Sequence, residues 1–319
     1  NAEFQGQSAL ASGAIIIKGE LTQKISGKSL QPSGTHFMLT GTAPQTVNFE
    51  KPGTGVRSFF KNLTLRNPAG VTFTSDIFIT GQLKLEAGTK LEQAPGFSTN
   101  FTSVLPQIES GSYAINNSNI AGALVMHDDL RLQLPATNLT ILPKQSLTLN
   151  GHTLELGGNF KAGVFSAEKH LIMNHASDRL IVNGDAAFEG LNVLQAGTIV
   201  LRGNLLQTIS AAALQPEGTA FVFDGKETQI VSFERPGAGN RSYLREVTIN
   251  TTASVRALTD VFVTGQINNY GRFEVVATRS LFLTNAAGVN HHSGTLVGSG
   301  IVNTPTNSFT NDGNVRPGA

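Results

Sequence analysis

The sequence contains one motif twice in which charged residues and glycines recur at the same spacing. Residues 49–58 read Phe-Glu-Lys-Pro-Gly-Thr-Gly-Val-Arg-Ser, and residues 233–242 read Phe-Glu-Arg-Pro-Gly-Ala-Gly-Asn-Arg-Ser. A proline and two glycines predict a loop, and each loop keeps one carboxylate and one guanidinium. Such a pair either binds a polar ligand such as a glycan or closes its own loop as an ion pair, which is worth less than about 1 kcal/mol when exposed. The four candidate ligand-binding residues are Glu50, Arg57, Glu234 and Arg241.

A second group of titratable residues, His127-Asp128-Asp129, is the alternative catalytic candidate. Glycoside hydrolysis needs two carboxyl groups about 5 to 9.5 Å apart. Adjacent residues of a strand point to opposite faces, so the two aspartates diverge unless they lie in a turn. The simpler interpretation is an exposed turn. We therefore expect no catalytic residue and no enzyme activity.

Motifs for metals and cofactors are missing from the sequence. The chain has no cysteine, and its 7 histidines match no known ligand spacing. No EF-hand loop occurs, and no glycine-rich phosphate loop opens a helix. We expect neither a metal nor a cofactor.

Composition and charge restrict the partners. The 23 basic and 22 acidic side chains leave a net charge of +1, so no polyanion-binding surface is expected and nucleic acid is excluded as a partner. No stretch approaches the roughly 20 apolar residues that a spanning helix needs, so we expect no membrane span in this chain. The start without methionine and the end within an apparent turn indicate a fragment of a longer protein.

An internal duplication organises the chain. Residues 13–83 and 197–267 align without a gap at an offset of 184, and 31 of the 71 positions are identical. We interpret residues 1–12 as an N-terminal tail or cap, 13–196 as the first repeat unit, and 197–319 as a second, truncated unit. A repeat of this length points to an architecture built by adding similar elements.

The local pattern predicts an all-β chain. Strands of three to five residues follow one another, separated by Gly, Asn, Pro or Asp. Such short strands favour a right-handed parallel β-helix, in which each coil stacks its inward side chains on the coil before. Tandem β-sandwiches remain the alternative. We expect an interior stack formed by Phe37, Phe49, Phe59, Phe60, Phe73 and Phe78.

Two sets of phrases resemble repeats of large secreted bacterial surface proteins. The first set is Phe-Phe-Lys-Asn-Leu-Thr-Leu at 59–65 with Gly-Val-Thr-Phe at 70–73, and its second copy at 242–250. The second set, at 293–303 and 311–318, is similar to repeats of autotransporter passengers and adhesins. The resemblance covers most of the chain. It implies a parallel β-helix that is exported and displayed as an adhesin, stalk or scaffold.

These observations lead to an expected function. The chain is expected to be a non-enzymatic structural or adhesive segment of a larger exported bacterial protein, secreted or held at the cell surface. Expected partners are a surface protein or glycan of a host or neighbouring cell, and a second copy through end-to-end self-association. One alternative is a carbohydrate-active or glycan-binding β-helix like polysaccharide lyases and tailspikes. Another is a protein-binding module of a secretion or toxin system.

Overall fold

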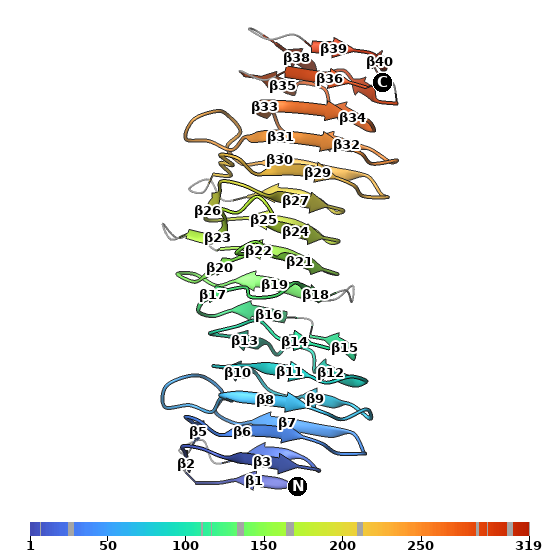
Figure 1. Cartoon of the computed structure of the whole chain (residues 1–319). Helices are drawn as coiled ribbons and strands as arrows, with labels where there is room; N and C mark the ends of the chain where they lie inside the picture. The colour runs from blue at the N-terminus through green and yellow to red at the C-terminus, as the bar shows by residue number, and fades with distance from the viewer. Residues whose placement is uncertain are drawn as a thin grey trace. The chain divides into compact units, whose positions relative to one another are not determined.

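The chain folds entirely into short parallel strands. The computed structural model describes residues 1–6, 8–24, 29–109, 111–115, 117–132, 137–163, 169–208, 213–284, 287–291, 293–304 and 309–318. Its described residues form strands β1 to β40 and no helix (Figure 1). The ladders within each compact unit are parallel, as between β3 and β6 or between β27 and β29. The predicted parallel β-solenoid is therefore confirmed, and tandem sandwiches, which are built from antiparallel sheets, are excluded.

The first compact unit comprises Asn1–Met126 and Leu132–Thr140. Each strand in it pairs with the strand one coil further along the chain. One sheet has the order β1 (Ala2–Phe4), β4 (Leu21–Gln23), β7 (Gln45–Phe49), β9 (Val71–Phe73), β12 (Thr89–Gln93) and β15 (Gly111–Ala114). A second has the order β3 (Ala14–Ile17), β6 (His36–Leu39), β8 (Asn62–Leu65), β11 (Leu83–Leu85) and β14 (Gln107–Ile108). The remaining ladders join β2 (Ser8–Leu10) to β5 (Leu30–Pro32), and β10 (Ile77–Ile79) to β13 (Thr99–Phe101) and β16 (Asn117–Ile120).

The second compact unit comprises His127–Arg131 and Ile141–Ala319. One sheet has the order β21 (Thr153–Leu156), β24 (Arg179–Val182), β27 (Thr198–Leu201), β29 (Ala220–Phe223), β31 (Leu244–Ile249), β33 (Val261–Asn269), β35 (Ser280–Leu283) and β38 (Ile301–Asn303). A second has the order β22 (Phe160–Ala162), β25 (Ala186–Phe188), β28 (Leu205–Gln207), β30 (Gln229–Phe233), β32 (Val255–Ala257), β34 (Arg272–Val275), β37 (Thr295–Gly298) and β40 (Asn314–Pro317). Shorter ladders join β20 (Ser146–Thr148), β23 (Lys169–Met173) and β26 (Leu191–Leu194), and join β33 to β36 (Ala287–Asn290) and β39 (Phe309–Asn311). Strands β17 (Ala123–Val125), β18 (Leu130–Leu132) and β19 (Asn138–Ile141) lie in sequence where the two units meet.

Alternating side chains build the core of each unit. In β7 the burial pattern alternates, with Gln45, Val47 and Phe49 buried and the residues between them only half-buried. The register keeps inward positions aligned, because Val47 pairs with Leu21 on one side and with Phe73 on the other. Stacked apolar positions therefore form a continuous interior column, which is the main source of stability in this architecture.

The expected aromatic stack is correct at four positions and wrong at two. Phe37, Phe49, Phe60 and Phe73 are buried, and the rings of Phe37 and Phe60 lie 5.3 Å apart. By contrast, Phe59 and Phe78 are only half-buried and face outward. The alternation of strands explains this, because each is the sequence neighbour of an inward residue and so points to the opposite face.

The duplication is also visible in a buried glutamine that hydrogen-bonds three backbone groups at the start of β7 and again at the start of β30. We call this set of hydrogen bonds the buried bracket. In the first copy Gln45 Oε1 accepts from Gly41 N at 2.9 Å, and its Nε2 donates to the carbonyls of Ile17 and Gly19 at 3.1 and 2.6 Å. In the second copy the corresponding distances at Gln229, to Gly225 N, Leu201 O and Gly203 O, are 2.9, 2.9 and 2.7 Å. The same three backbone groups at each corner are thus satisfied by the same side chain.

Candidate functional site

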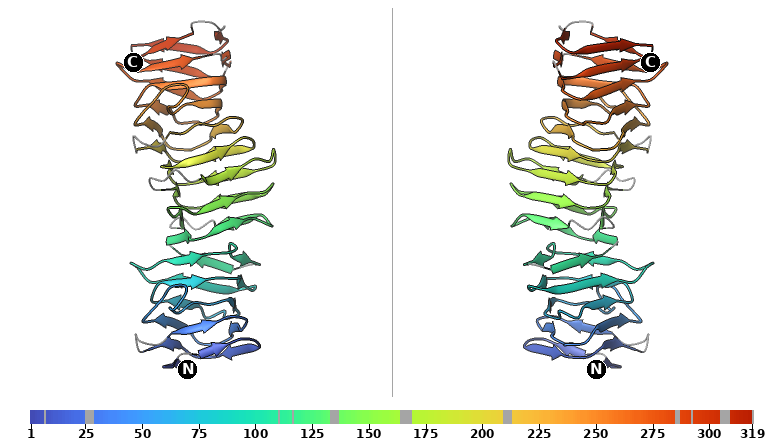
Figure 2. Two further views of the ribbon diagram at one scale, coloured as in Figure 1. Left: turned by 90° about the vertical axis from the view of Figure 1, so that its left-hand side faces the viewer. Right: turned by 90° about the vertical axis from the view of Figure 1, so that its right-hand side faces the viewer.

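The first glycine-rich loop, residues 51–58, is closed by its own backbone. Gly53 N donates to Ser58 O at 2.9 Å, and Ser58 N donates to Lys51 O at 2.7 Å. The buried Ser58 Oγ accepts from Leu30 N at 3.0 Å and so ties the base of the loop to the preceding coil. The loop stands off the first unit (Figures 1 and 2).

The second loop, residues 235–242, has the same closure within the second unit. Gly237 N donates to Ser242 O at 2.9 Å, and Ser242 N donates to Arg235 O at 2.8 Å. Ser242 Oγ accepts from Leu214 N at 3.1 Å. The repeated sequence therefore specifies a repeated loop conformation.

The four candidate side chains in these loops are separate from one another. All four are exposed, and in the described part of the chain no ion pair joins Glu50 to Arg57 or Glu234 to Arg241. The hypothesis that an ion pair closes each loop is therefore wrong, because backbone groups and a serine hydroxyl do so instead. Ligand binding by these residues stays a prediction.

The two loop arginines lie over glycines. A Cβ on Gly53 would come within 2.5 Å of Arg57 Cδ, and a Cβ on Gly237 within 2.6 Å of Arg241 Cδ. The two glycines also have φ values of 142° and 151°, which side chains disfavour. Each glycine thus supports the stem of an arginine whose guanidinium remains in solvent.

His127, Asp128 and Asp129 lie in an exposed turn between β17 and β18. Asp129 Oδ1 accepts from Thr153 N at 2.8 Å and lies 3.5 Å from His152 Nδ1. The Asp129 carboxylate therefore satisfies a backbone N–H group of the next coil. The interpretation as an exposed turn is confirmed.

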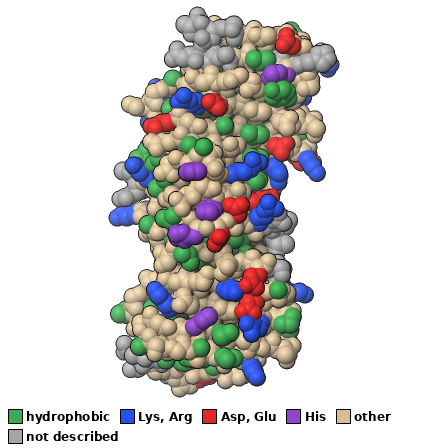
Figure 3. All heavy atoms as spheres, viewed as in Figure 1, with side chains coloured by type: hydrophobic (Ala, Val, Ile, Leu, Met, Phe, Trp, Pro, Cys, Tyr) green, Lys and Arg blue, Asp and Glu red, His purple; other side chains and the backbone are tan. Residues whose placement is uncertain are grey.

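Charged side chains also line the ends of successive strands, where coils turn. In the first unit Arg66, after β8, forms a bidentate pair with Glu86, after β11, with one Nη2–Oε1 distance of 2.8 Å. The guanidinium of Arg66 lowers the pKa of the Glu86 carboxyl. Lys84, in the middle of β11, forms an ion pair with Glu109 at an Nζ–Oε1 distance of 2.7 Å. Figure 3 shows basic and acidic side chains side by side on this face, so their charges offset each other locally.

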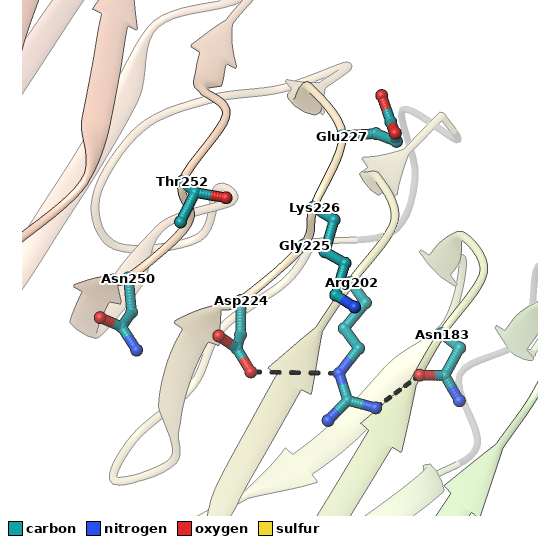
Figure 4. A pocket seen from close by; sticks show the side chains of 8 residues that line it. All are labelled: Asn183, Arg202, Asp224, Gly225, Lys226, Glu227, Asn250 and Thr252. Atoms are coloured by element: carbon teal, nitrogen blue, oxygen red, sulfur yellow. Dashed lines mark hydrogen bonds and ion pairs between the residues drawn. The ribbon is translucent and has the colours of Figure 1, made fainter.

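In the second unit the equivalent strand ends form an open groove of about 700 Å³. We call it the polar groove, and its lining residues are Asn183, Arg202, Asp224, Gly225, Lys226, Glu227, Asn250 and Thr252 (Figure 4). Arg202 Nη1 donates to Asn183 Oδ1 at 2.7 Å, and Arg202 Nε lies 4.0 Å from Asp224 Oδ2. The guanidinium is thereby held between side chains of its two neighbouring coils.

A buried scaffold fixes the turn that borders the polar groove. Gly225 N is held by Gln229, and Gly225 O accepts from Thr251 Oγ1 at 2.6 Å. Asp224 and Lys226 flank this anchored glycine, whereas Glu227 points away from Arg202 (Figure 4). The backbone from which the groove side chains project is therefore set before any ligand arrives.

An outward aromatic row follows the base of the second loop. Phe262 and Phe282, in paired positions of β33 and β35, stack at 4.3 Å with an interplanar angle of 12°. Tyr243 is half-buried at the base of the loop, and its N donates to Leu214 O at 3.0 Å. Burial first, and then the charge of Glu217, raise the pKa of the Tyr243 phenol. Stacking thus covers one face of each phenylalanine ring.

The described residues contain no group of three or more His, Asp or Glu side chains arranged to hold a metal. Among the same residues no helix is long and apolar enough to cross a membrane.

Sequence reasoning missed the polar groove. Its charged and amide residues come directly after strands, but their spacing varies from 19 residues between Asn183 and Arg202 to 26 between Asp224 and Asn250. A comparison of the two copies contained a usable signal. Asp224, Lys226 and Glu227 replace the uncharged residues Thr40, Thr42 and Ala43 of the first copy.

Comparisons with known protein families, with curated proteins and with solved structures found no match to this chain.

Proposed function

We propose that the chain is a non-enzymatic structural and adhesive β-solenoid segment of a larger exported bacterial surface protein. The main support for the proposal is that both copies of the duplication contain the same side chains that hold the backbone in place. The buried bracket of Gln45 recurs at Gln229, and the loop closure of Ser58 recurs at Ser242. These are elements of a scaffold, which a solenoid extends by adding coils.

The exposed strand ends support the same proposal because their chemistry changes between copies. Arg66 of the first copy corresponds to Asn250 in the alignment. Glu86 and Tyr270 occupy equivalent places in their coils, because their N–H groups donate to Leu65 O and Ile249 O. A catalytic site depends on a fixed constellation of acid, base or nucleophile at a defined distance. In the duplicated loops the shared carboxylate and guanidinium are exposed and form no ion pair with each other. This arrangement suits contact with a partner at the surface better than proton transfer to a bound substrate.

Export and surface display rest on the resemblance of residues 59–65 and 293–303 to repeats of secreted bacterial proteins. The cysteine-free composition, with 14% charged residues, is compatible with that setting. A host or neighbouring-cell protein or glycan is the proposed partner.

The test combines an activity assay with an adhesion assay. We expect no reducing ends and no unsaturated products when the chain is incubated with a panel of neutral and acidic polysaccharides. Beads coated with the folded chain are expected to adhere to cell surfaces more than beads coated with the heat-unfolded chain. Product release from any of these polysaccharides would contradict the proposal, and its loss in E50Q/E234Q would place the catalysis in the loops. Equal adhesion by both sets of beads would also contradict the proposal.

A further inference from the structure

We propose that the polar groove of the second unit binds a segment of a neutral oligosaccharide. Its volume of about 700 Å³ falls within the roughly 300–1,000 Å³ usual for small-molecule sites. The proposal rests on the non-enzymatic function proposed above and adds a ligand class and a location.

The charges of the groove favour a neutral ligand. Arg202 and Lys226 are balanced by Asp224 and Glu227, so the lining has no excess of either sign. Arg202 also lies 3.6 Å from Glu155 Oε1, which offsets its charge further. A phosphate or polyanion needs an excess of positive charge, which this lining does not offer.

The hydrogen-bonding groups match hydroxyl groups. A hydroxyl both donates and accepts, and the groove combines carboxylate acceptors with guanidinium and ammonium donors and with the amides of Asn183 and Asn250. Arg202 uses Nη1 on Asn183, and no hydrogen bond within the described residues uses its Nη2. That donor is held in place and available to a ligand.

The order of residues along the groove fits a linear ligand. Asp224 N donates to Leu201 O and Asn250 N donates to Phe223 O, each at 2.9 Å, so these residues occupy the same position in successive coils. Successive coils lie about 4.8 Å apart in the direction of pairing. A chain of sugar rings running across the coils therefore meets a polar side chain at each step.

An aromatic ring extends this row by one coil. Tyr270 N donates to Ile249 O at 2.8 Å, which places Tyr270 after Asn250 in the row, and its ring is 41% exposed. His291, one coil further, stacks on it at 3.8 Å and 10°. His291 thus covers one face of the ring, and the exposed part of Tyr270 lies one coil beyond Asn250, where it can contact the end of a ligand that extends past the groove.

The first copy provides a matched control for the groove. At the positions of Asp224, Lys226 and Glu227 it has uncharged residues, on a turn held by Gln45 in the same way that Gln229 holds the second. The triple variant D224T/K226T/E227A therefore installs side chains that this turn already accommodates in a folded coil.

The experiment begins with an array of short neutral oligosaccharides of glucose, mannose, galactose and N-acetylglucosamine beside acidic ones. The best binder is then titrated calorimetrically against the full chain and its variants. We expect at least one neutral oligosaccharide to bind, and D224T/K226T/E227A to weaken it about tenfold or more, since three charged hydrogen-bonding partners of the ligand hydroxyls are lost together. R202K, which installs the residue found at Lys18, should weaken it less, and K90A, at an exposed position of the first unit, should leave it unchanged.

Three outcomes overturn the proposal. The first is that no neutral oligosaccharide binds. The second is that only acidic oligosaccharides bind and that salt abolishes this binding. The third is that the triple variant binds as tightly as the wild type although its unfolding midpoint is the same. Cleavage of a bound oligosaccharide is a different result. It contradicts the proposed function but leaves the groove as the binding site if the triple variant still loses affinity.

Discussion

At the scale of single residues, two buried glutamines hold the corners of the solenoid. The amide of Gln229 satisfies one N–H and two carbonyls that lie where the chain leaves one sheet and enters the next. Backbone groups at such corners have no strand partner, and an unsatisfied buried group costs about 1–3 kcal/mol. The side chain therefore matters more for stability than its polarity suggests.

Replacing this glutamine should destabilise the second unit. We expect Q229A to lower the free energy of unfolding by about 3 kcal/mol, because three buried backbone groups lose their partner together. Q266A, at an exposed position, should change it by about 0.5 kcal/mol or less. Urea unfolding followed by circular dichroism measures both, and equal effects of the two variants would contradict the assigned role.

A second residue-scale prediction concerns alkaline pH. Burial raises the pKa of Tyr113 above its ordinary value of 10.0, although its hydrogen bond with Ser118 acts in the opposite direction. A raised folded-state pKa means that the folded chain holds the proton more tightly than the unfolded chain. The resulting stability is present below about pH 10 and is lost as pH rises beyond it. We expect the free energy of unfolding to fall above pH 10 less steeply in Y113F than in the wild type, and identical slopes would exclude Tyr113 as a contributor.

At the scale of elements, the residues that close each glycine-rich loop differ from the residues that the loop exposes to solvent. Closure depends on backbone hydrogen bonds and on a buried serine, while the arginine projects into solvent. Structural and surface roles thus fall on adjacent residues, Arg57 and Ser58, in the same loop.

Alanine substitutions should distinguish these roles. S58A leaves the buried Leu30 N without its acceptor and should cost about 1–3 kcal/mol of unfolding free energy. R57A should cost less than about 0.5 kcal/mol, and R57A/R241A should equal the sum of the single variants because distant sites are additive. A large effect of R57A in thermal unfolding would show that the guanidinium has a structural partner.

The sequence predicted elements better than it predicted the site. Short punctuated strands and the gap-free duplication sufficed for the parallel solenoid, because both can be read from the sequence without knowing which strands pair. The outward position of Phe59 followed from alternation but was missed, since two adjacent phenylalanines both look like core residues. The polar groove was out of reach because its members align only once the length of each coil is known, and those lengths vary from 19 to 26 residues.

At the scale of the whole molecule, the two copies separate scaffold from surface. Inward and bracket positions recur, while strand-end side chains differ between Thr40 and Asp224 or between Arg66 and Asn250. Since each coil contacts mainly its neighbours, a solenoid can change its surface coil by coil without disturbing its core. The second unit can therefore have a ligand-binding groove that the first unit lacks.

The most direct test of this account is a chain in which residues 197–267 are replaced by the sequence of residues 13–83. Because the copies align without a gap and share their buried brackets, we expect the chimera to fold with the same circular dichroism spectrum. Its unfolding midpoint should lie within about 5 °C of the wild type. It should also lose the neutral oligosaccharide binding of the polar groove. A chimera that fails to fold, or that folds and still binds the oligosaccharide with wild-type affinity, would contradict the separation of scaffold from surface.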